Sequence, residues 1–310
     1  MIRGSGLSFP KHRKLKGEWL CAYLFIAPLC VGTAVFGLFP VVCSLFLSFT
    51  DWELLTGFGG FVGLKNFITV FTKSETLYEI RNTLMYAVFY VPITLLLSLG
   101  IANLLNKPVR GKGVFRVIYF LPNIVMPAAV ALIWRFLLNT KFGLVNVCLG
   151  ALHLPTPSWI SDPHYIMASL IIVSIWSGIG YNTIILLASI QGIPRDMFEA
   201  ADLEGASGFT VFWKITFPMV SPSVFFLLTM GIMKAMRAFD IVYMFIGKDN
   251  WSAGGPLLAA VRTMVYGIYT NAFERMDMGF ASAESVVLFL MIMAMTAIQF
   301  KVQKKWVYYD

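Results

Sequence analysis

Three charged residues stand close together inside a long apolar segment in the last third of the chain. They are Lys234, Arg237 and Asp240, and their spacing of three residues would bring them near one face of a continuous helix. Counting about 1.5 Å per residue from a start near Pro222 predicts that Lys234 lies close to the middle of a bilayer. Charges at that depth are costly and mark functional sites by default. We therefore expect these residues to line a path for a polar solute.

The charge of Lys234 leaves three explanations open. Its neighbour Arg237 is also a cation, so a compensating anion has to come from elsewhere. An acidic cargo, most plausibly an oligosaccharide containing uronic acid, would supply that anion. Asp240 and Glu284, the latter at the outer end of the last apolar segment, would instead neutralise both cations in a closed network. In the third explanation Arg237 reaches the outer interface and Lys234 is deprotonated.

A second candidate surface lies in the apolar segment 166–191. Trp176, Tyr181 and Asn182 stand within seven residues of one another, next to Gly178 and Gly180. Aromatic rings stack on the C–H faces of sugars, and amides bond sugar hydroxyls, so these types suit a saccharide. Ordinary packing against neighbouring helices is the alternative explanation for each of them.

Residue patterns of an enzyme are missing from the sequence. It contains no G-x-x-x-x-G-K-[ST] phosphate loop and no Ser/His/Asp or Cys/His arrangement that suggests a nucleophile. The four cysteines and three histidines have neither a disulfide framework nor the spacing of a metal site. We predict that the chain is not an enzyme and that it carries no cofactor or metal of its own.

The elements that position these residues are predicted from hydropathy. With 58% hydrophobic and 13% charged residues, the chain has the composition of an all-α integral membrane protein. Six segments are long and apolar enough to span a bilayer, and we place them at residues 20–46, 83–105, 117–138, 166–191, 222–246 and 280–300. The net charge of +8 comes from basic residues that flank these segments, which argues against a nucleic-acid partner.

The distribution of Lys and Arg predicts the orientation of the spans. With the N-terminus inside, 14 basic residues fall on the cytoplasmic side and 7 on the external side. Both termini are therefore expected in the cytoplasm, with loops 50–81 and 247–279 outside. The first apolar segment is too long for a cleavable signal peptide and is expected to remain as a span.

A polar cytoplasmic loop, residues 194–218, separates the fourth and fifth spans. Pro194 is suited to open a short helix and Gly205 to end it, which predicts a helix of about three turns outside the bilayer. Its apolar side contains Met197, Ala200 and Ala201. Residues 195–204 contain four acids and one base, whereas helices that lie on anionic leaflets are usually basic. We expect this side to contact another protein.

The same loop carries a family resemblance. It contains, in this order, Glu199, Ala200, Ala201, Gly205, Ile215 and Pro218. This arrangement resembles the EAA loop of binding-protein-dependent ABC importer permeases, in the maltose-permease-like sugar subgroup. Further stretches that resemble sugar-permease motifs occur in family order, namely Phe61–Phe67 with Asn82 and Thr83, Phe115–Val125 with Trp134, Gly254–Pro256 and Met278–Ser285.

The resemblance implies a type I ABC importer permease fold, a single transmembrane domain over residues 1–310, and location in a bacterial plasma membrane. It implies a second homologous permease, a cytoplasmic dimer of ABC ATPases that holds Mg-ATP, an extracellular solute-binding protein, and an oligosaccharide cargo. Glu199, Ala200, Ala201 and Gly205 would form the coupling helix on the ATPase. In the family, the fifth span contacts sugar near the pair matched by Phe239 and Asp240, and Lys234 and Arg237 depart from its usual neutral groups.

An ion-coupled secondary transporter of a polar solute remains the alternative function. Such a protein would use intramembrane acids such as Asp240 and Glu284 for coupling and would usually show internal repeats, none of which is visible.

Overall fold

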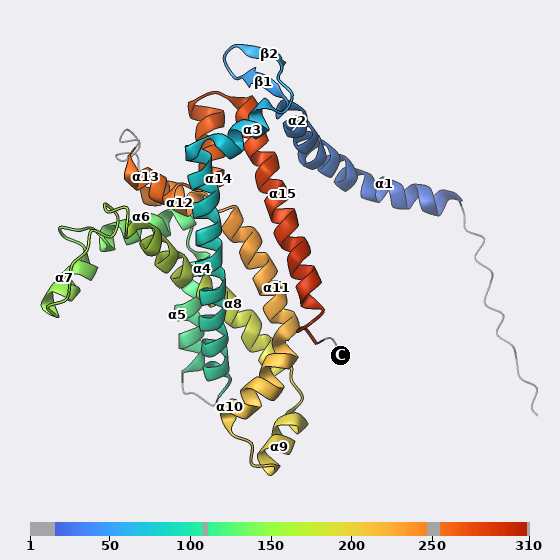
Figure 1. Cartoon of the computed structure of the whole chain (residues 1–310). Coiled ribbons are helices and arrows are strands. Elements are labelled where there is room, and N and C mark those ends of the chain that lie inside the picture. The colour runs from blue at the N-terminus through green and yellow to red at the C-terminus, as the bar shows by residue number, and fades with distance from the viewer. Residues whose placement is uncertain (1–15, 108–110, 247–254, 309–310) are drawn as a thin grey trace, which may run out of the picture. The chain divides into compact units, whose positions relative to one another are not determined.

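Figure 1 shows the computed structural model of the chain, which describes residues 16–107, 111–246 and 255–308. Most of the N-terminal basic residues, and Gly254 of the motif 254–256, lie outside these ranges. The chain divides into two compact units, Met1–Phe46 and Leu47–Asp310.

The first unit is a long apolar helix. Helix α1 (Lys16–Thr33) continues through a π-helical turn (Ala34–Leu38) into α2 (Phe39–Leu47), whose last residue belongs to the second unit. The apolar stretch of 29 residues, Trp19–Leu47, is about 44 Å long at 1.5 Å per residue and exceeds the thickness of a bilayer core. A helix satisfies its backbone hydrogen bonds internally, as a lipid-exposed segment must. This helix covers the predicted first span.

In its described residues, the second unit consists of helices and one hairpin. The hairpin pairs β1 (Thr50–Glu53) with β2 (Gly57–Phe61) antiparallel, in a register that joins Trp52 to Phe58. The helices are α3 (Lys65–Thr72), α4 (Ser74–Asn106), α5 (Lys112–Ile124), α6 (Pro127–Leu137), α7 (Leu144–Ala151), α8 (Ile166–Gln191), α9 (Arg195–Leu203), α10 (Gly208–Val211), α11 (Phe217–Met236), α12 (Asp240–Ile246), α13 (Pro256–Val261), α14 (Met264–Tyr269) and α15 (Met278–Gln303). Two further π-helical turns, Phe212–Thr216 and Thr270–Glu274, precede α11 and follow α14.

The centre of this unit is the packing of α8 against α4, α5 and α11. Two glycines of α8 allow close approach: a Cβ on Gly180 would overlap the backbone carbonyl of Tyr119 on α5, and one on Gly178 would lie 2.7 Å from the Tyr90 hydroxyl on α4. One buried apolar cluster contains Leu170 and Phe245, and the other contains Leu186. These helices therefore form a tightly packed frame around the polar residues inside it.

The part of the chain that the structure describes holds five helices long and apolar enough to cross a membrane, or six if the bent pair α5 and α6 counts as one span. Helix α8 ends where the fourth predicted span ends. The third predicted span, residues 117–138, is not one continuous helix, because α5 and α6 meet at an angle of 102°. The cause is Pro127: the residue before a proline avoids helical geometry, and Met126 adopts φ −55°, ψ 134°.

The predicted fifth span, residues 222–246, also needs correction at both ends. The helix begins at Gly208 and runs through the π-helical turn to Met236, where it stops. Arg237 has φ −104° and ψ 19°, and Asp240 starts the separate helix α12. Cations favour the C-terminal turn of a helix, where backbone carbonyls carry partial negative charge, so Lys234 and Arg237 suit this ending. Lys234, Arg237 and Asp240 therefore do not share the face of one continuous helix.

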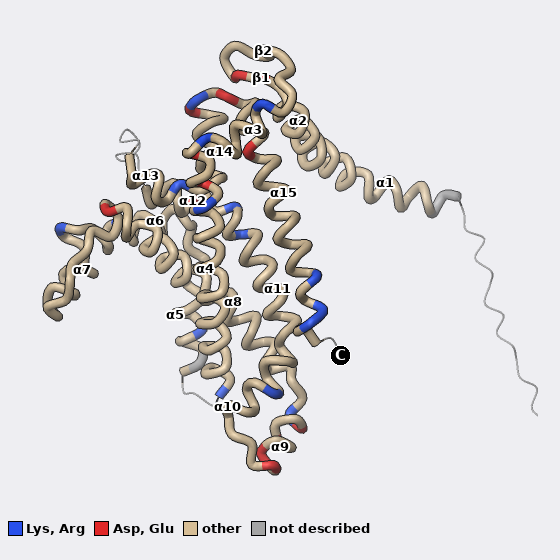
Figure 2. Tube along the Cα trace, viewed as in Figure 1, with Lys and Arg blue, Asp and Glu red and all other residues tan. Residues whose placement is uncertain are grey.

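The hairpin and α9 lie at opposite ends of the second unit (Figure 1). Helix α15 begins beside β1, where Glu53 pairs with Asp277, and runs toward the start of α11, where the Trp306 ring after its end lies 6.5 Å from that of Phe217. Charged residues gather at these two ends, while α4, α8 and α15 are largely uncharged between them (Figure 2). This is the distribution expected of helices that cross an apolar layer.

Candidate functional site

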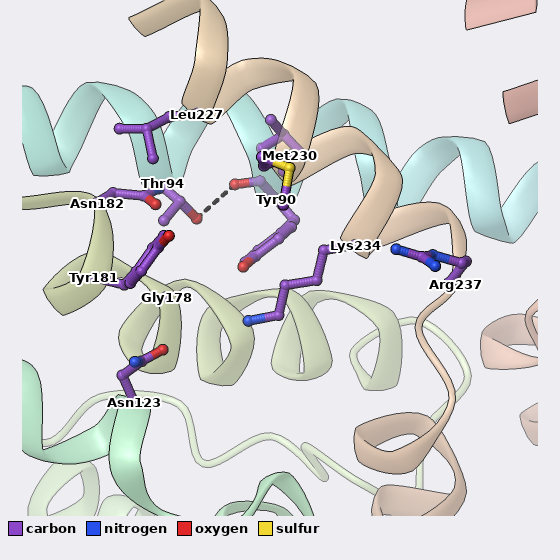
Figure 3. A pocket seen from close by; sticks show the side chains of 12 residues that line it. Tyr90, Thr94, Asn123, Gly178, Tyr181, Asn182, Leu227, Met230, Lys234 and Arg237 are labelled. Atoms are coloured by element: carbon purple, nitrogen blue, oxygen red, sulfur yellow. Dashed lines mark hydrogen bonds between the residues drawn. The ribbon is translucent and has the colours of Figure 1, made fainter. Parts of the chain in front are cut away.

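A cavity of about 570 Å³ lies among α4, α5, α8 and α11. Its lining combines apolar side chains with polar ones, the latter shown in Figure 3 together with Leu227, Met230 and Gly178. The polar members come from all four helices: Tyr90, Thr94, Asn123, Tyr181, Asn182, Lys234 and Arg237. A volume in this range is typical of sites that hold a small molecule.

Two cations dominate the electrostatics of this cavity. The side chain of Lys234 extends into it, and Arg237 lies at its edge (Figure 3). Arg237 donates from Nε to the Met233 carbonyl oxygen at 3.2 Å, which fixes its position on the last turn of α11. Among the described residues, no Asp or Glu lines the cavity or forms an ion pair with either cation. The cavity therefore offers two positive charges to an anion.

Four of the seven residues predicted to line the substrate path meet in this cavity, namely Tyr181, Asn182, Lys234 and Arg237. Trp176 lies outside the lining and packs edge-on against Trp134, with ring centroids 5.4 Å apart. Asp240 is exposed at the start of α12. Within the described ranges the structure thus contains no ion pair between Arg237 and Asp240.

Glu284 belongs to a different cluster, a buried network near the hairpin. Its carboxylate accepts hydrogen bonds from Asn271 Nδ2 at 2.8 Å and from Thr76 Oγ1 at 3.4 Å. Nearby, Glu79 forms an ion pair with Arg262, with Oε1 and Nε 2.5 Å apart. The closed network of Lys234 with Asp240 and Glu284, one of the three explanations left open by the sequence, is therefore absent from the described part of the chain.

Sequence reasoning missed the contribution of α4 to the cavity. Tyr90 and Thr94 both line it, and Thr94 Oγ1 donates to the Tyr90 carbonyl oxygen at 2.6 Å. A signal was present, because Tyr86, Tyr90, Thr94 and Ser98 recur every four residues and share one face of a helix. The absence of a side chain at Gly178 leaves space for the Tyr90 hydroxyl.

Helix α9 forms a separate exposed site at the far end of the second unit. It ends in a Schellman motif, in which the Ala206 amide donates to the Ala201 carbonyl oxygen and Gly205 adopts φ +68°. The predicted helix and its glycine stop are confirmed. Ala201 is buried against its own chain, whereas Glu199, Ala200 and Leu203 are exposed, Leu203 at 91%. The surface free to meet a partner is therefore the side that contains Leu203.

An all-helical membrane protein with a polar cavity among its spanning helices and an exposed helix at one end has the architecture of a membrane permease. Residues 95–308 match the family described as "Binding-protein-dependent transport system inner membrane component". The chain belongs to this family and is a permease subunit of a binding-protein-dependent ABC importer in the bacterial inner membrane. It is not itself an ATPase, since ATP is bound by a partner subunit. This membership decides against the ion-coupled secondary transporter.

Relatives of the chain match it over nearly its whole length. It is 34% identical to the "Probable ABC transporter permease protein YesP" of Bacillus subtilis, over 100% of this chain and 99% of that protein. It is 31% identical to the "sn-glycerol-3-phosphate transport system permease protein UgpA" of Agrobacterium fabrum, over 93% and 96%. The UgpA protein of Yersinia enterocolitica is 34% identical, over 94% and 97%.

Solved structures confirm the fold. A chain of a bacterial alginate ABC transporter, in complex with an alginate-bound periplasmic protein, matches with a TM-score of 0.81 and 18% identity, over 94% of this chain and 96% of that one. A second structure of a transporter that imports the acidic polysaccharide alginate matches with a TM-score of 0.78 and 20% identity, over the same shares. The type I importer permease fold is thereby established.

Proposed function

We propose that this permease carries an acidic oligosaccharide, delivered by an extracellular binding protein, through the cavity that contains Lys234 and Arg237. The observation that carries the proposal is the pair of cations without an acidic neighbour among the described residues. A carboxylate on the cargo would supply the charge that the protein does not. Tyr90 and Tyr181 offer aromatic faces, and Asn123 and Asn182 offer amides, for the sugar rings and hydroxyls.

The named relatives support an anionic cargo and suggest a second candidate. UgpA proteins are named for sn-glycerol-3-phosphate, a small anion that also carries hydroxyl groups. The same two cations would suit a phosphate. We favour an oligosaccharide because the cavity offers aromatic and amide groups in addition to the cations.

The decisive experiment compares cargoes in the complete importer, reconstituted in proteoliposomes with its own binding protein. We expect uptake of an alginate tetrasaccharide to exceed that of a neutral tetrasaccharide, and the variant Lys234→Met to abolish it. Lys234→Arg keeps the charge, and Lys301→Met removes an exposed cation from α15 as a matched control. Equal uptake of the acidic and neutral tetrasaccharides contradicts the proposal, and uptake of glycerol-3-phosphate alone supports the second candidate.

The proposed assembly includes a second homologous permease and a pair of cytoplasmic ATPases, one of which docks on α9. Its exposed face supports this role, because Leu203 and the nearby Phe209 are large apolar side chains exposed at 91% and 76%. Both termini and the loop 194–218 would lie in the cytoplasm, with the hairpin outside.

Coupling through α9 is tested with Glu199→Lys and Gly205→Asp. We expect both variants to assemble and to lose cargo-stimulated ATP hydrolysis, because the first reverses an exposed charge and the second puts a side chain on a residue with positive φ. Glu53→Lys on β1 is the charge-matched control at the other end of the unit. Wild-type ATP hydrolysis and uptake in both α9 variants would show that this helix does not transmit the signal.

A further inference from the structure

A second cavity, of about 450 Å³, lies in the end of the second unit that carries the hairpin. Charged residues that are far apart in the sequence meet there, around α14 and the start of α4 (Figure 2). Besides Thr270, its polar lining consists of Glu75, Tyr78, Arg262, Tyr266, Glu274 and Arg275. None of the residues predicted for the substrate path belongs to it.

The inner wall of this cavity is held rigidly. Arg262 is buried, forms the ion pair with Glu79 and donates from Nη2 to Thr270 Oγ1 at 2.8 Å. Its guanidinium lies 5.8 Å from the ring centroid of Tyr266, which is also buried. A side chain with these partners cannot reorient at low cost, so the wall presents a preformed surface.

The outer wall is an exposed ion pair. Arg275 donates from Nη1 to Glu75 Oε2 at 2.8 Å and to Asn271 Oδ1 at 3.0 Å. The hydrogen bond with Glu75 raises the pKa of Arg275 above its ordinary value, so this residue stays charged. In the described part of the chain, the Glu274 carboxylate and the Tyr78 hydroxyl form no hydrogen bond within the protein. Both groups are free to bond a ligand.

The charges of this lining balance in number, because it contains two arginines and two glutamates. The first cavity differs, since its two cations have no acid beside them. A balanced set of guanidinium, carboxylate and phenol groups has donors and acceptors but no net charge to attract an ion. Such a set fits the hydroxyl groups of a sugar ring better than it fits a carboxylate or a phosphate.

Aromatic side chains connect the two cavities. The Tyr266 ring lies 6.2 Å from that of Tyr243, which lies 5.2 Å from that of Phe239. Phe239 follows Arg237, at the edge of the first cavity, by two residues. These rings pack against the buried apolar cluster, so they link the walls of the two cavities through packed side chains.

We infer that the second cavity is an outer saccharide subsite, which holds one unit of an oligosaccharide by its hydroxyls before the chain reaches Lys234 and Arg237. The inference rests on the proposed saccharide cargo. It adds a prediction that the cargo proposal does not make: substitutions in this cavity affect long saccharides and spare short ones, because a short cargo occupies the inner cavity alone.

The test compares two cargo lengths in the reconstituted importer. With Glu274→Gln or Tyr78→Ala, the KM for an alginate tetrasaccharide should rise about tenfold, the effect of losing one hydrogen bond to a charged group or one stacking contact. The KM for an alginate disaccharide should change less than about twofold, because the disaccharide does not reach this cavity. A twofold change in KM corresponds to less than about 0.5 kcal/mol of binding free energy. Leu77→Ala replaces the neighbouring exposed residue outside the cavity and serves as control. A diazirine-tagged alginate tetrasaccharide should label peptides from residues 74–81 or 262–275.

The following results would contradict the proposed subsite. Equal changes for both lengths, or no change and no labelled peptide from these segments, show that saccharide does not bind there. Weaker binding of the saccharide-free binding protein to the variants assigns the cavity to a protein contact instead. If the wild-type importer prefers neutral cargo, the acidic proposal fails separately, and the length comparison is repeated with a neutral tetrasaccharide and disaccharide.

Discussion

Removal of the buried guanidinium of Arg262 should destabilise the permease more than any single change in an exposed ion pair. Arg262 Nε lies 2.5 Å from Glu79 Oε1, and the two side chains are 9% and 1% exposed. The variant Arg262→Met leaves the Glu79 carboxylate without a cation in a place that water does not reach. Glu284, fully buried in the same region, would add a second carboxylate to the uncompensated charge.

Two estimates of the cost agree. Unit charges about 4 Å apart attract by roughly 4 kcal/mol at an effective dielectric constant near 20. Removal of one partner from a buried pair typically costs about 3–5 kcal/mol, while exchange of both partners for apolar side chains is often neutral. We therefore expect Arg262→Met to lower the free energy of unfolding by about 4 kcal/mol, and the double variant with Glu79→Met to recover most of that loss.

The measurement is unfolding of the purified permease by SDS in mixed micelles, followed by far-UV circular dichroism. Arg275→Met is the matched control, because its pair with Glu75 has both side chains 44% exposed and should be worth less than about 1 kcal/mol. If the two arginine variants lose equal stability, or if the double variant is no more stable than Arg262→Met, the burial argument is wrong.

Two further predictions use the helix packing and the topology. Gly180→Ala should lower the free energy of unfolding by about 1–3 kcal/mol in the same SDS assay, because its Cβ would overlap the Tyr119 carbonyl. Gly100→Ala has open space around it and should be neutral or stabilising by up to about 1 kcal/mol. Similar values for both variants would refute the close-approach argument. In a cysteine-free background, a membrane-impermeant thiol reagent should label Thr56→Cys in intact cells and leave Asp196→Cys unlabelled until the membrane is opened, and labelling of Asp196→Cys in intact cells would reverse the topology.

Hydropathy predicted where the long helices are, since each must satisfy its backbone internally and cover it with apolar side chains. Helix α8 shows the strength of this signal: residues 166–191 form the helix, and Gly192 and Pro194 follow its end. Hydropathy does not register breaks, because an interrupted apolar segment has the same composition as a continuous one. The bend before Pro127 was readable from the proline itself, whereas the end of α11 at Met236 has no such residue.

The sequence indicated which residues belong to the candidate site better than it indicated which residues they contact. Lys234 and Arg237 stood out as charges in an apolar segment, and the structure places both at one cavity. The pairing of Glu79 with Arg262 joins residues far apart in the sequence, and no local pattern indicates it. The sequence did not indicate that Thr94 lines the cavity, for another reason. A hydroxyl that donates to its own helix backbone is compatible with an apolar segment, so its presence there does not predict a site.

The end of α11 changes the physical argument for an anionic cargo. A cation in the middle of a continuous spanning helix would cost about 3 kcal/mol or more, and this cost alone would call for an anion. At the last turn of a helix the backbone carbonyls stabilise a cation by about 0.3–1 kcal/mol. Arg237 also donates a hydrogen bond to the Met233 carbonyl oxygen. The end of α11 thus compensates both cations in part, but Arg237 also has a hydrogen-bond acceptor, whereas Lys234 extends into the cavity. Lys234 is therefore the sharper test of what the permease carries.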